Sequence, residues 1–542
     1  MRRSGVTAIL VAAMAVGAIG CSGGGTSDTA ATNGPQASGV PPATAKDRQM
    51  VGNMYTTGLP IVKDKVTLKG VMSKASTQAK SIEQLKVVQD AEARTNVKIA
   101  WEQIPAASFK EKKNLILASG DLPDFFAGGL EDVDIATYGS QGMLVPLEQL
   151  IDKYAPNVKK VLEARPEYKK GVTASDGHIY TLPLVEEQEF LKFYDGLMIN
   201  TKWLAKLNLK MPTTPDELVQ VLRAFKDKDP NGNGKQDEIP YSFIYGMAPY
   251  GIYSMFGAFG LTDNTNHLVV KNGKLVFTAV QPEYKEAVKW YAQLHKEGLI
   301  DKESLTQDDK VFFSKGREGI LGVFSGVSEN NMIAEKDFGT YAAVPPLKGP
   351  SGEQVWSRQY PGFSRSGFAI TKANKNPEIT MRWIDAMYTD KIGLEWRMGP
   401  IGINLKENGD GSFEYMETPQ GMAYGEFRHS EAPGSVSPVA VLSETFNKLK
   451  MQTAQQIRQN SYLIYKPFLE KEIYPIAFFS IEDLTRINTL KTDIYGLINK
   501  KQAEWIAKGT IDAEWNDYVS QLNKMGLDEM MKLYQKYYDK SK

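Results

Sequence analysis

The chain has 542 residues, of which 42% are apolar and 24% are charged, so a fibrous or largely disordered protein is excluded for most of its length. Lysine plus arginine number 64, as do aspartate plus glutamate, which gives a formal net charge of zero. Nucleic acid is therefore not an expected partner, because neutralising phosphates requires a cationic surplus.

The N-terminus has the pattern of an export signal. Arg2 and Arg3 precede a run of small and apolar residues from Gly5 to Gly20, shorter than the roughly 20 residues of a membrane-spanning helix. Cys21, the only cysteine, follows directly. This order resembles a bacterial lipoprotein signal, so we expect residues 1–20 to be removed and Cys21 to be lipidated. An ordinary secretory signal or an uncleaved anchor is the alternative.

Residues 21–60 are predicted to be the lipidated N-terminus and a flexible tether. From Ser22 to Lys46 the chain is rich in serine, glycine, threonine, alanine and proline and poor in large apolar side chains. Such a composition cannot bury a core.

The folded part opens with alternating strand and helix patterns. Strands are predicted at 66–72, 97–101 and 124–127, with one helix that begins after Ser81 and a second that Ser108 caps and Gly120 ends. Strands that alternate with helices predict a parallel sheet with right-handed crossovers.

Later segments are mostly helical. Helices are predicted after Thr214, at 282–297, after Asn376 and through the last 60 residues, with a strand at 368–370. The sequence therefore predicts an α/β protein with a helix-rich second half.

The loop from Asp227 to Glu238 (Asp-Lys-Asp-Pro-Asn-Gly-Asn-Gly-Lys-Gln-Asp-Glu) has the closely spaced oxygen ligands that calcium requires. One register starts at Asp227 and follows the EF-hand spacing, with Gly232 sixth and Glu238 twelfth. The other register starts at Asp229. We prefer the second, because Pro240 argues against the helix that should follow an EF-hand loop. The preferred ligands are Asp229, Asn231, Asn233, the Lys235 carbonyl, Asp237 and Glu238. A solvated turn without an ion is the alternative.

Catalytic signatures are weak. The metalloprotease, nucleophile-elbow and phosphate-loop strings do not occur in the sequence. Asp121 and Asp124 are spaced like a glycosidase carboxylate pair, but a turn in which Asp121 accepts backbone hydrogen bonds is the preferred interpretation. No enzymatic activity is expected.

Aromatic and polar residues in segments rich in glycine and proline suggest a sugar site, since a sugar has apolar faces and hydroxyl edges. The candidate ligand-binding residues are Glu186, Tyr250, Trp356, Arg358, Tyr360 and Phe363. Aromatic side chains that anchor loops, and a solvated Glu186, are the alternatives.

Several motifs together resemble the extracellular solute-binding lipoproteins of carbohydrate ABC importers, in the large Gram-positive branch that is similar to alginate-oligosaccharide-binding proteins. They are Ala-Ser-Gly-Asp-Leu-Pro-Asp at 118–124, Gly-Met-Leu-Val-Pro-Leu at 142–147, Asp-Gly-His-Ile-Tyr-Thr-Leu-Pro at 176–183, Met-Pro-Thr-Thr-Pro-Asp-Glu-Leu at 211–218 and the loop at 229–240. In this family the loop binds calcium in the Asp229 register, as a structural cofactor.

The resemblance implies a two-lobed, periplasmic-binding-protein-like α/β fold with a hinge. By the order of the segments, residues 61–184 and 352–400 would form the first lobe, and residues 185–351 and 401–542 the second. The protein would capture an oligosaccharide between the lobes and deliver it to the ABC permease, while its lipid holds it on the outer face of the cell membrane. We expect a monomer.

Two other functions remain open on the sequence. A secreted, calcium-stabilised polysaccharide hydrolase or lyase would need a catalytic set that the sequence does not display. A receptor for a peptide or another non-sugar solute would use Arg358, Arg365 and Arg397 to bind a carboxylate, and the same arginines suit a uronate.

Overall fold

The computed structural model describes residues 48–541, except 76–77, 194, 331, 334–336, 359–361, 421, 423 and 437. The predicted signal peptide and Cys21 lie outside the described residues. The two largest β-sheets of the described residues are separate from each other, and each has its own layers of helices and its own apolar core.

The first lobe is built on a six-stranded sheet with the order β16-β6-β13-β5-β3-β4. Its strands are β3 (Val66–Lys74), β4 (Val97–Pro105), β5 (Phe125–Phe126), β6 (Leu182–Glu186), β13 (Phe363–Ile370) and β16 (Ala440–Val441). Strand β3 runs parallel to β4 and β5, with Val66 opposite Val97, whereas β13 is antiparallel to β5 and β6. The predicted parallel β-α-β-α-β unit is confirmed.

Helices cover this sheet because their apolar residues recur on one side. They are α1 (Lys86–Thr95), α2 (Ala106–Ser119), α3 (Asp132–Ser140), α4 (Glu148–Tyr154), α5 (Pro156–Ala164), α6 (Pro166–Val172), α11 (Pro377–Asp385) and α12 (Asp390–Met398). Gly120, at φ 74°, ends α2 as predicted. The predicted cap at Ser108 is wrong: β4 extends to Pro105 and turns directly into α2, so Pro105 occupies the N-cap position and no side-chain hydrogen bond caps the helix.

The second lobe is built on a four-stranded sheet with the order β12-β7-β11-β8. The strands are β7 (Leu197–Asn200), β8 (Ile239–Ser242), β11 (Leu321–Ser325) and β12 (Tyr341–Ala343), and a separate hairpin joins β9 (Leu268–Lys271) to β10 (Lys274–Phe277). Its helices are α7 (Thr201–Lys206), α8 (Pro215–Asp227), α9 (Pro282–Lys296), α10 (Asp309–Arg317), α15 (Thr453–Tyr465), α16 (Ile481–Lys508), α17 (Ile511–Lys524) and α18 (Leu527–Ser541). The second lobe is helix-rich, as predicted.

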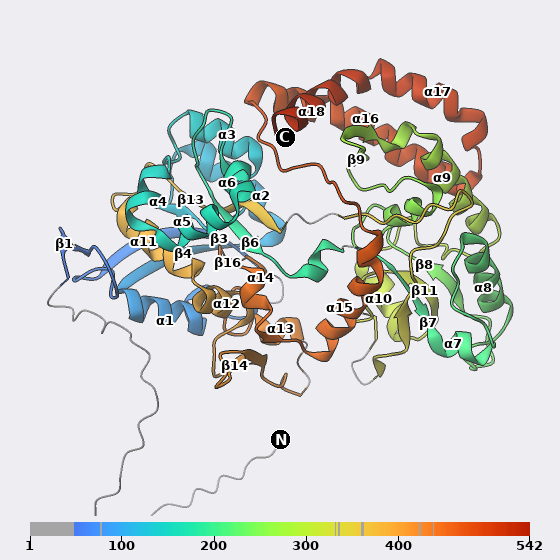
Figure 1. Ribbon diagram of the computed structural model, residues 1–542, viewed down its shortest axis with the longest axis horizontal. Helices are drawn as coiled ribbons and strands as arrows, with labels where there is room; N and C mark the ends of the chain where they lie inside the picture. Colours follow the sequence, from blue (N-terminus) through green and yellow to red (C-terminus); the bar gives the residue numbers. More distant parts are fainter. Residues whose placement is uncertain are drawn as a thin grey trace, which may run out of the picture. The chain divides into compact units, whose positions relative to one another are not determined.

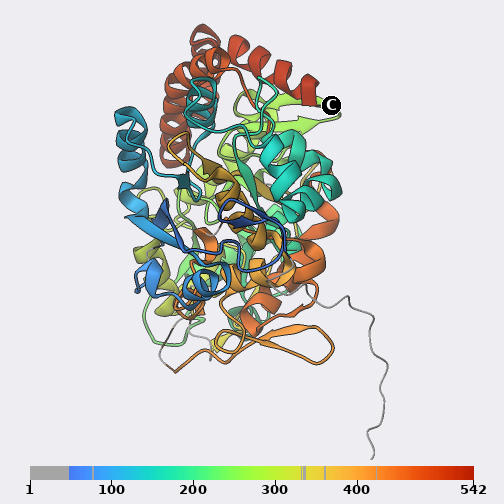
Figure 2. The same cartoon turned by 90° about the vertical axis from the view of Figure 1, so that its left-hand side faces the viewer.

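The C-terminal helices complete the second core. Trp505 of α16 is fully buried and its ring lies 4.7 Å from that of Tyr518 in α17. Leu275 N–H of β10 donates to Gln535 Oε1 of α18. In Figures 1 and 2 the red helices α16 to α18 accordingly lie against green elements from the middle of the chain. Residues separated by more than 200 positions therefore share one core.

The lobe boundaries differ from those predicted. Strand β6 continues to Glu186, so the chain leaves the first sheet only after that residue. A small sheet of β14 (Leu405–Glu407), β15 (Phe413–Tyr415) and β17 (Leu449–Lys450), together with the short helices α13 (Tyr424–Arg428) and α14 (Ser443–Phe446), packs on the first lobe. Residues 401–450 therefore belong to the first lobe rather than the second, because β16 returns to pair with β6.

The chain passes between the two sheets in three of the described stretches. The described residues of these stretches follow β6 (187–193 and 195–196), β12 (344–358 and 362) and β17 (451–452). Multiple crossings of this kind are consistent with the predicted hinge. Within the described residues, no helix is both long and apolar enough to span a bilayer.

Candidate functional site

A cavity of about 480 Å³ is lined by residues of both lobes. Asp132 comes from α3 and Arg365 from β13 of the first lobe, and Arg358 comes from the crossing segment at 344–362. Asn266 and Lys491 come from the second lobe, where Lys491 Nζ donates to Asn266 Oδ1 at 2.9 Å. A cavity of this size with convergent polar groups is typical of a small-ligand site.

Arg365 is held at the centre of this lining. Its side chain is almost fully buried, and Nη1 lies 3.1 Å from Asp132 Oδ2 and donates to the Ala477 carbonyl at 3.3 Å. The guanidinium stacks on the Phe478 ring at 3.8 Å. Nε and Nη2 have no hydrogen-bond partner among the described residues. Burial lowers the pKa of Arg365, and Asp132 opposes that shift.

Glu470 forms a second polar group in the cavity. Thr262 Oγ1 donates to its carboxylate, and Arg358 N–H donates to Oε2 at 3.2 Å. Burial raises the pKa of Glu470 to about 7, although these hydrogen bonds oppose the shift. Glu470 therefore changes its charge near neutral pH.

Aromatic rings provide flat walls. Tyr474, Phe479 and Tyr534 line the cavity, and the rings of Tyr474 and Phe479 each lie 5.7 Å from that of Tyr534. The Tyr474 hydroxyl donates to the Tyr534 carbonyl at 3.1 Å. Apolar faces beside hydrogen-bonding groups suit a ligand with both kinds of surface.

Another cavity, of about 340 Å³, opens at the edge of the first sheet. Ser73 near the end of β3 and Gly128 and Gly129 just after β5 line it, with Lys113 at one side. Lys113 is buried and pairs with Asp134 at 2.5 Å. Ligands of open α/β sheets bind outside the carboxyl ends of the strands, where this cavity lies.

The predicted ligand-binding residues are not gathered in one place. Glu186 is buried at the end of β6 and pairs with Arg397 of α12. Phe363 begins β13, is 5% exposed and packs against the Tyr168 ring at 4.5 Å. Both residues lie in the first lobe, and their side chains contact other residues of that lobe. Their role in ligand binding stays a prediction.

The remaining candidates come from the second lobe and its crossing segment. Trp356 is 2% exposed, and its Nε1 donates to the Asp195 carbonyl at 2.9 Å, which places it in the second core. Tyr250 lines a broad cavity of about 1190 Å³ that also contains residues of the small sheet. Arg358 lines the interlobe cavity. Tyr360 lies outside the described residues.

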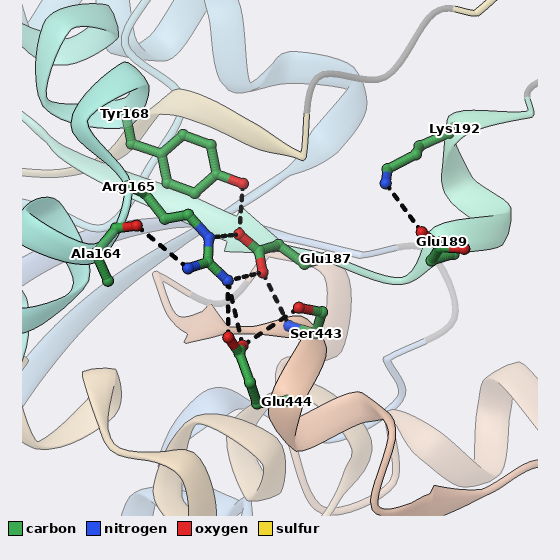
Figure 3. A network of polar contacts seen from close by, with 8 residues as sticks. All are labelled: Ala164, Arg165, Tyr168, Glu187, Glu189, Lys192, Ser443 and Glu444. Carbon is green, nitrogen blue, oxygen red and sulfur yellow. Dashed lines mark hydrogen bonds and ion pairs between the residues drawn. The ribbon is translucent and has the colours of Figure 1, made fainter.

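The other carboxylates considered in the sequence have structural partners. Glu187 Oε1 and Oε2 accept from Arg165 at 2.8 and 2.9 Å, and the carboxylate also accepts from the Tyr168 hydroxyl and from Ser443 N–H (Figure 3). Burial alone would raise the pKa of Glu187, but these donors hold it at about 2. The network ties the start of the first crossing to the first lobe.

In the turn after α2, Asp124 rather than Asp121 accepts the backbone hydrogen bond. Its Oδ2 accepts from Lys69 N–H at 2.6 Å, whereas Asp121 N–H donates to Ser119 Oγ. The turn was predicted, but its acceptor was assigned to the wrong aspartate. Asp124 takes this role because it directly precedes β5, which pairs with β3.

The predicted calcium loop joins α8 to β8 and wraps around Asp229. Asp229 accepts from Gly232 N–H at 2.7 Å and from Gly234 N–H at 3.0 Å, and both glycines have positive φ. The Gly234 and Gly232 N–H groups lower the pKa of Asp229. A strand rather than a helix follows the loop, as Pro240 predicted.

Among the carboxylates at the C-terminal end of the loop, one oxygen atom has no hydrogen-bond partner among the described residues. Asn231 Nδ2 donates to Asp237 Oδ1 at 2.9 Å, and Asn233 Nδ2 donates to the same carboxylate. Glu238 Oε2 is buried and has no hydrogen-bond partner among the described residues, and burial raises the pKa of Glu238. The donor set therefore fits a hard cation, which would satisfy this oxygen.

Binding of a calcium ion in this loop would require neutral oxygen ligands as well as carboxylates. Within the described residues, no group of three or more histidine, cysteine, aspartate or glutamate side chains is arranged to hold a metal. An ion in the loop would need the amide oxygens of Asn231 and Asn233 and the Lys235 carbonyl as well as the carboxylates.

Comparison with known proteins identifies the family. The family model described as bacterial extracellular solute-binding protein matches residues 74–393. The chain belongs to this family. A relative from Streptococcus pneumoniae serotype 4 (strain ATCC BAA-334 / TIGR4), the fructooligosaccharide ABC transporter substrate-binding protein FusA, is 38% identical over 496 residues, which cover 88% of this chain and 91% of the relative.

Solved structures agree with this assignment. The structure of S. pneumoniae FusA in complex with kestose matches with a TM-score of 0.80 and 38% identity, covering 88% of this chain and 99% of that one. An EF-hand mutant of FusA in complex with fructo-nystose gives the same values. The alginate-binding protein AlgQ2 has a similar fold, with a TM-score of 0.69 and 24% identity, covering 88% of this chain and 99% of that one. The two-lobed solute-binding fold predicted from the sequence is therefore confirmed.

Sequence reasoning missed part of the interlobe cavity. Asp132, Glu470 and the aromatic residues of the 473–479 segment were not among the candidates, although Arg365 was considered for a carboxylate ligand. No local signal marks them, since Arg365 and Ala477 are in contact but 112 positions apart.

Proposed function

We propose that this solute-binding protein captures a short oligosaccharide of the fructooligosaccharide type and delivers it unaltered to an ABC permease. The observation that carries the proposal is the 38% identity to FusA, which extends over nearly the whole folded chain. FusA has been solved in complex with kestose. The interlobe cavity supports it, because arginine and carboxylate groups next to aromatic walls match the hydroxyl edges and apolar faces of a sugar.

Binding would act by a shift of population between open and closed lobes. A ligand that contacts both lobes binds the closed form more tightly, and this difference in affinity limits how far the equilibrium shifts. The crossings after β6, β12 and β17 would be the hinge. The closed form would then be recognised by the permease.

We propose that Cys21 carries the lipid that anchors the protein outside the cell membrane. The basic N-terminus, the short apolar run and the small residues before Cys21 support this. The polar tether would raise the effective concentration of the receptor near the permease. A Cys21→Ser variant should appear in the culture medium instead of the membrane fraction. Retention of that variant in the membrane would refute lipidation at Cys21.

Titration calorimetry with kestose tests the ligand. We expect saturable binding to kestose and none to maltotriose, which has the same number of sugar units. Saturating kestose at 100 times the dissociation constant should add about 2.7 kcal/mol to the free energy of unfolding. Chromatography after long incubation should recover intact kestose. Absence of binding would refute the fructooligosaccharide assignment, and hydrolysis would refute the receptor function.

We propose that calcium occupies the loop in the Asp229 register, held by Asp229, Asn231, Asn233, the Lys235 carbonyl, Asp237 and Glu238. The ion would cross-link the loop between α8 and β8 and supply charge neutralisation, with no part in chemistry. The buried, unpartnered Glu238 Oε2 supports this proposal.

Thermal unfolding with calcium or with a chelator tests the site. Chelation should lower the melting temperature of the wild type. Asp229→Asn should abolish this calcium dependence, whereas Asp227→Asn should retain it, because Asp227 is a ligand only in the EF-hand register. Loss of the calcium dependence in both variants would establish the EF-hand register, in which Asp227 and Asp229 are both ligands, and no calcium effect on the wild type would remove the site.

A further inference from the structure

Two arginines with unused hydrogen-bond donors line the interlobe cavity. Arg365 is 3% exposed, and its Nε and Nη2 lack partners among the described residues. Arg358, on the crossing segment, likewise has a buried Nε without a partner there. Buried polar atoms are nearly always hydrogen-bonded, since a buried donor without an acceptor has lost its hydrogen bonds to water and gained none in return.

The two arginines are distinguished by their place in the cavity lining: Arg397 also has a buried Nε and Nη1 without a partner among the described residues, but it does not line the interlobe cavity. Lys113 and Lys315 are also well buried, but each pairs with a carboxylate at 2.5–2.7 Å. Arg365 uses Nη1 on Asp132 and on the Ala477 carbonyl and leaves two donors. A planar guanidinium held by stacking on Phe478 is preorganised, so little rotamer entropy is lost when an acceptor arrives.

We propose that Arg365 and Arg358 are ligand-anchoring residues that donate to oxygen atoms of the bound saccharide in the interlobe cavity. This inference rests on the proposed function and specifies where the sugar is held. Asp132 balances the charge of Arg365, so the acceptor can be a neutral hydroxyl oxygen. A uronate carboxylate would satisfy the same donors.

The position of Arg365 between elements of the two lobes would couple ligand binding to the opening and closing of the lobes. Arg365 belongs to the first sheet, whereas Ala477 and Phe478, which cover it, belong to the segment that leads into α16 of the second lobe. Separation of this contact would uncover the donors, and closure over a sugar would bury them against an acceptor. Nε and Nη2 of Arg365 therefore gain acceptors only when ligand is present.

Calorimetry on the full mature chain with Arg365→Met and Arg358→Met tests the proposal, with kestose and trigalacturonate as separate ligands. We expect each variant to lose about tenfold or more in affinity. Arg365→Lys keeps the charge opposite Asp132 and should also bind weakly, because it lacks the planar donors. Arg365→Lys replaces Arg365→Met as the test if the methionine variant does not fold.

Arg382→Met is the matched control. Arg382 is a partly buried arginine of the same lobe that donates to the Tyr55 and Gly58 carbonyls and does not line the cavity. Its substitution should lower the melting temperature and leave the dissociation constant within twofold. Arg365→Met should weaken kestose binding whatever its effect on the melting temperature, because it removes the unmet donors and also leaves Asp132 without its partner.

The outcomes separate this inference from the proposed function. Loss of kestose binding in Arg365→Met supports both. Binding of trigalacturonate alone, lost in the variant, supports the anchor and refutes the fructooligosaccharide assignment. Unchanged affinity in Arg365→Met overturns the anchor and leaves the receptor function intact. Binding of neither sugar overturns both.

Discussion

The carboxylate of Glu187 should contribute strongly to the stability of the first lobe. It accepts four hydrogen bonds, two from Arg165 and one each from Tyr168 and Ser443 N–H (Figure 3). These interactions move its pKa from 4.5 to about 2. A shift of about 2.5 units corresponds to roughly 3 kcal/mol in favour of the charged form.

We expect Glu187→Gln to lower the free energy of unfolding by about 2–4 kcal/mol, because the change removes the charge that faces Arg165. Glu444→Gln is the control: Glu444 also contacts Arg165, but its side chain is 63% exposed, so its loss should cost less than about 1 kcal/mol. Urea unfolding followed by tryptophan fluorescence measures both. Equal effects of the two substitutions would refute the reasoning.

The pH dependence gives a second test of the same network. The pKa of Glu187 is lower in the folded state, so its contribution is complete above about pH 4.5 and is lost as the pH falls towards 2. The difference in stability between the wild type and Glu187→Gln should therefore shrink over this interval. A difference that stays constant from pH 5 to pH 2 would contradict the assigned pKa.

Three further predictions address other parts of the fold. Gly129→Ala should lower the free energy of unfolding by about 2–4 kcal/mol, because its Cβ would lie 2.1 Å from the Phe109 ring and its φ is 82°. Gly120→Ala, at a similar φ but in open space, should lower it by about 1 kcal/mol, and equal losses in urea unfolding would refute the steric argument. Trp505→Ala should cost about 3–5 kcal/mol by the same measurement, because it empties the fully buried centre of the C-terminal helices, and a loss below 1 kcal/mol would contradict this. The pKa of Glu470 is raised from 4.5 to about 7 in the folded state. The free energy of unfolding of the wild type should therefore fall by up to about 3 kcal/mol as the pH rises from 4.5 to 7, and Glu470→Gln should not show this fall.

Local sequence signals predicted most of the regular structure. Thr214 and Pro215 begin α8, and Thr214 Oγ1 accepts from Glu217 N–H as expected of a cap. Gly120 ends α2 with a positive φ. These features depend on residues within one or two turns of each other, so the local sequence is enough to specify them. There are two exceptions. Continuation of β4 moves the N-cap position of α2 to Pro105, and a 3-10 turn at Ile82–Gln84 separates Ser81 from α1, which begins at Lys86.

The glycine and asparagine pattern of the 229–238 loop likewise specified its own turn. Gly232 and Gly234 supply the positive φ values that bring their N–H groups to Asp229. Pro240 excluded a following helix, and a strand is found there. A short loop can be predicted in this way because the hydrogen bonds from Gly232 and Gly234 to Asp229 span at most five residues.

The lobe boundaries and the interlobe cavity were decided by the tertiary structure. Residues 401–450 join the first lobe only because β16 pairs with β6, more than 250 positions earlier. Arg365, Asp132 and Ala477 meet because a sheet strand, a helix and an extended segment from three distant parts of the chain converge. Periodicity and capping act over a few residues, whereas these contacts depend on the order in which strands pair and on how often the chain crosses between two cores. The sequence by itself therefore determined the elements, the loop and the family, and the folded arrangement alone determined which side chains line the interlobe cavity.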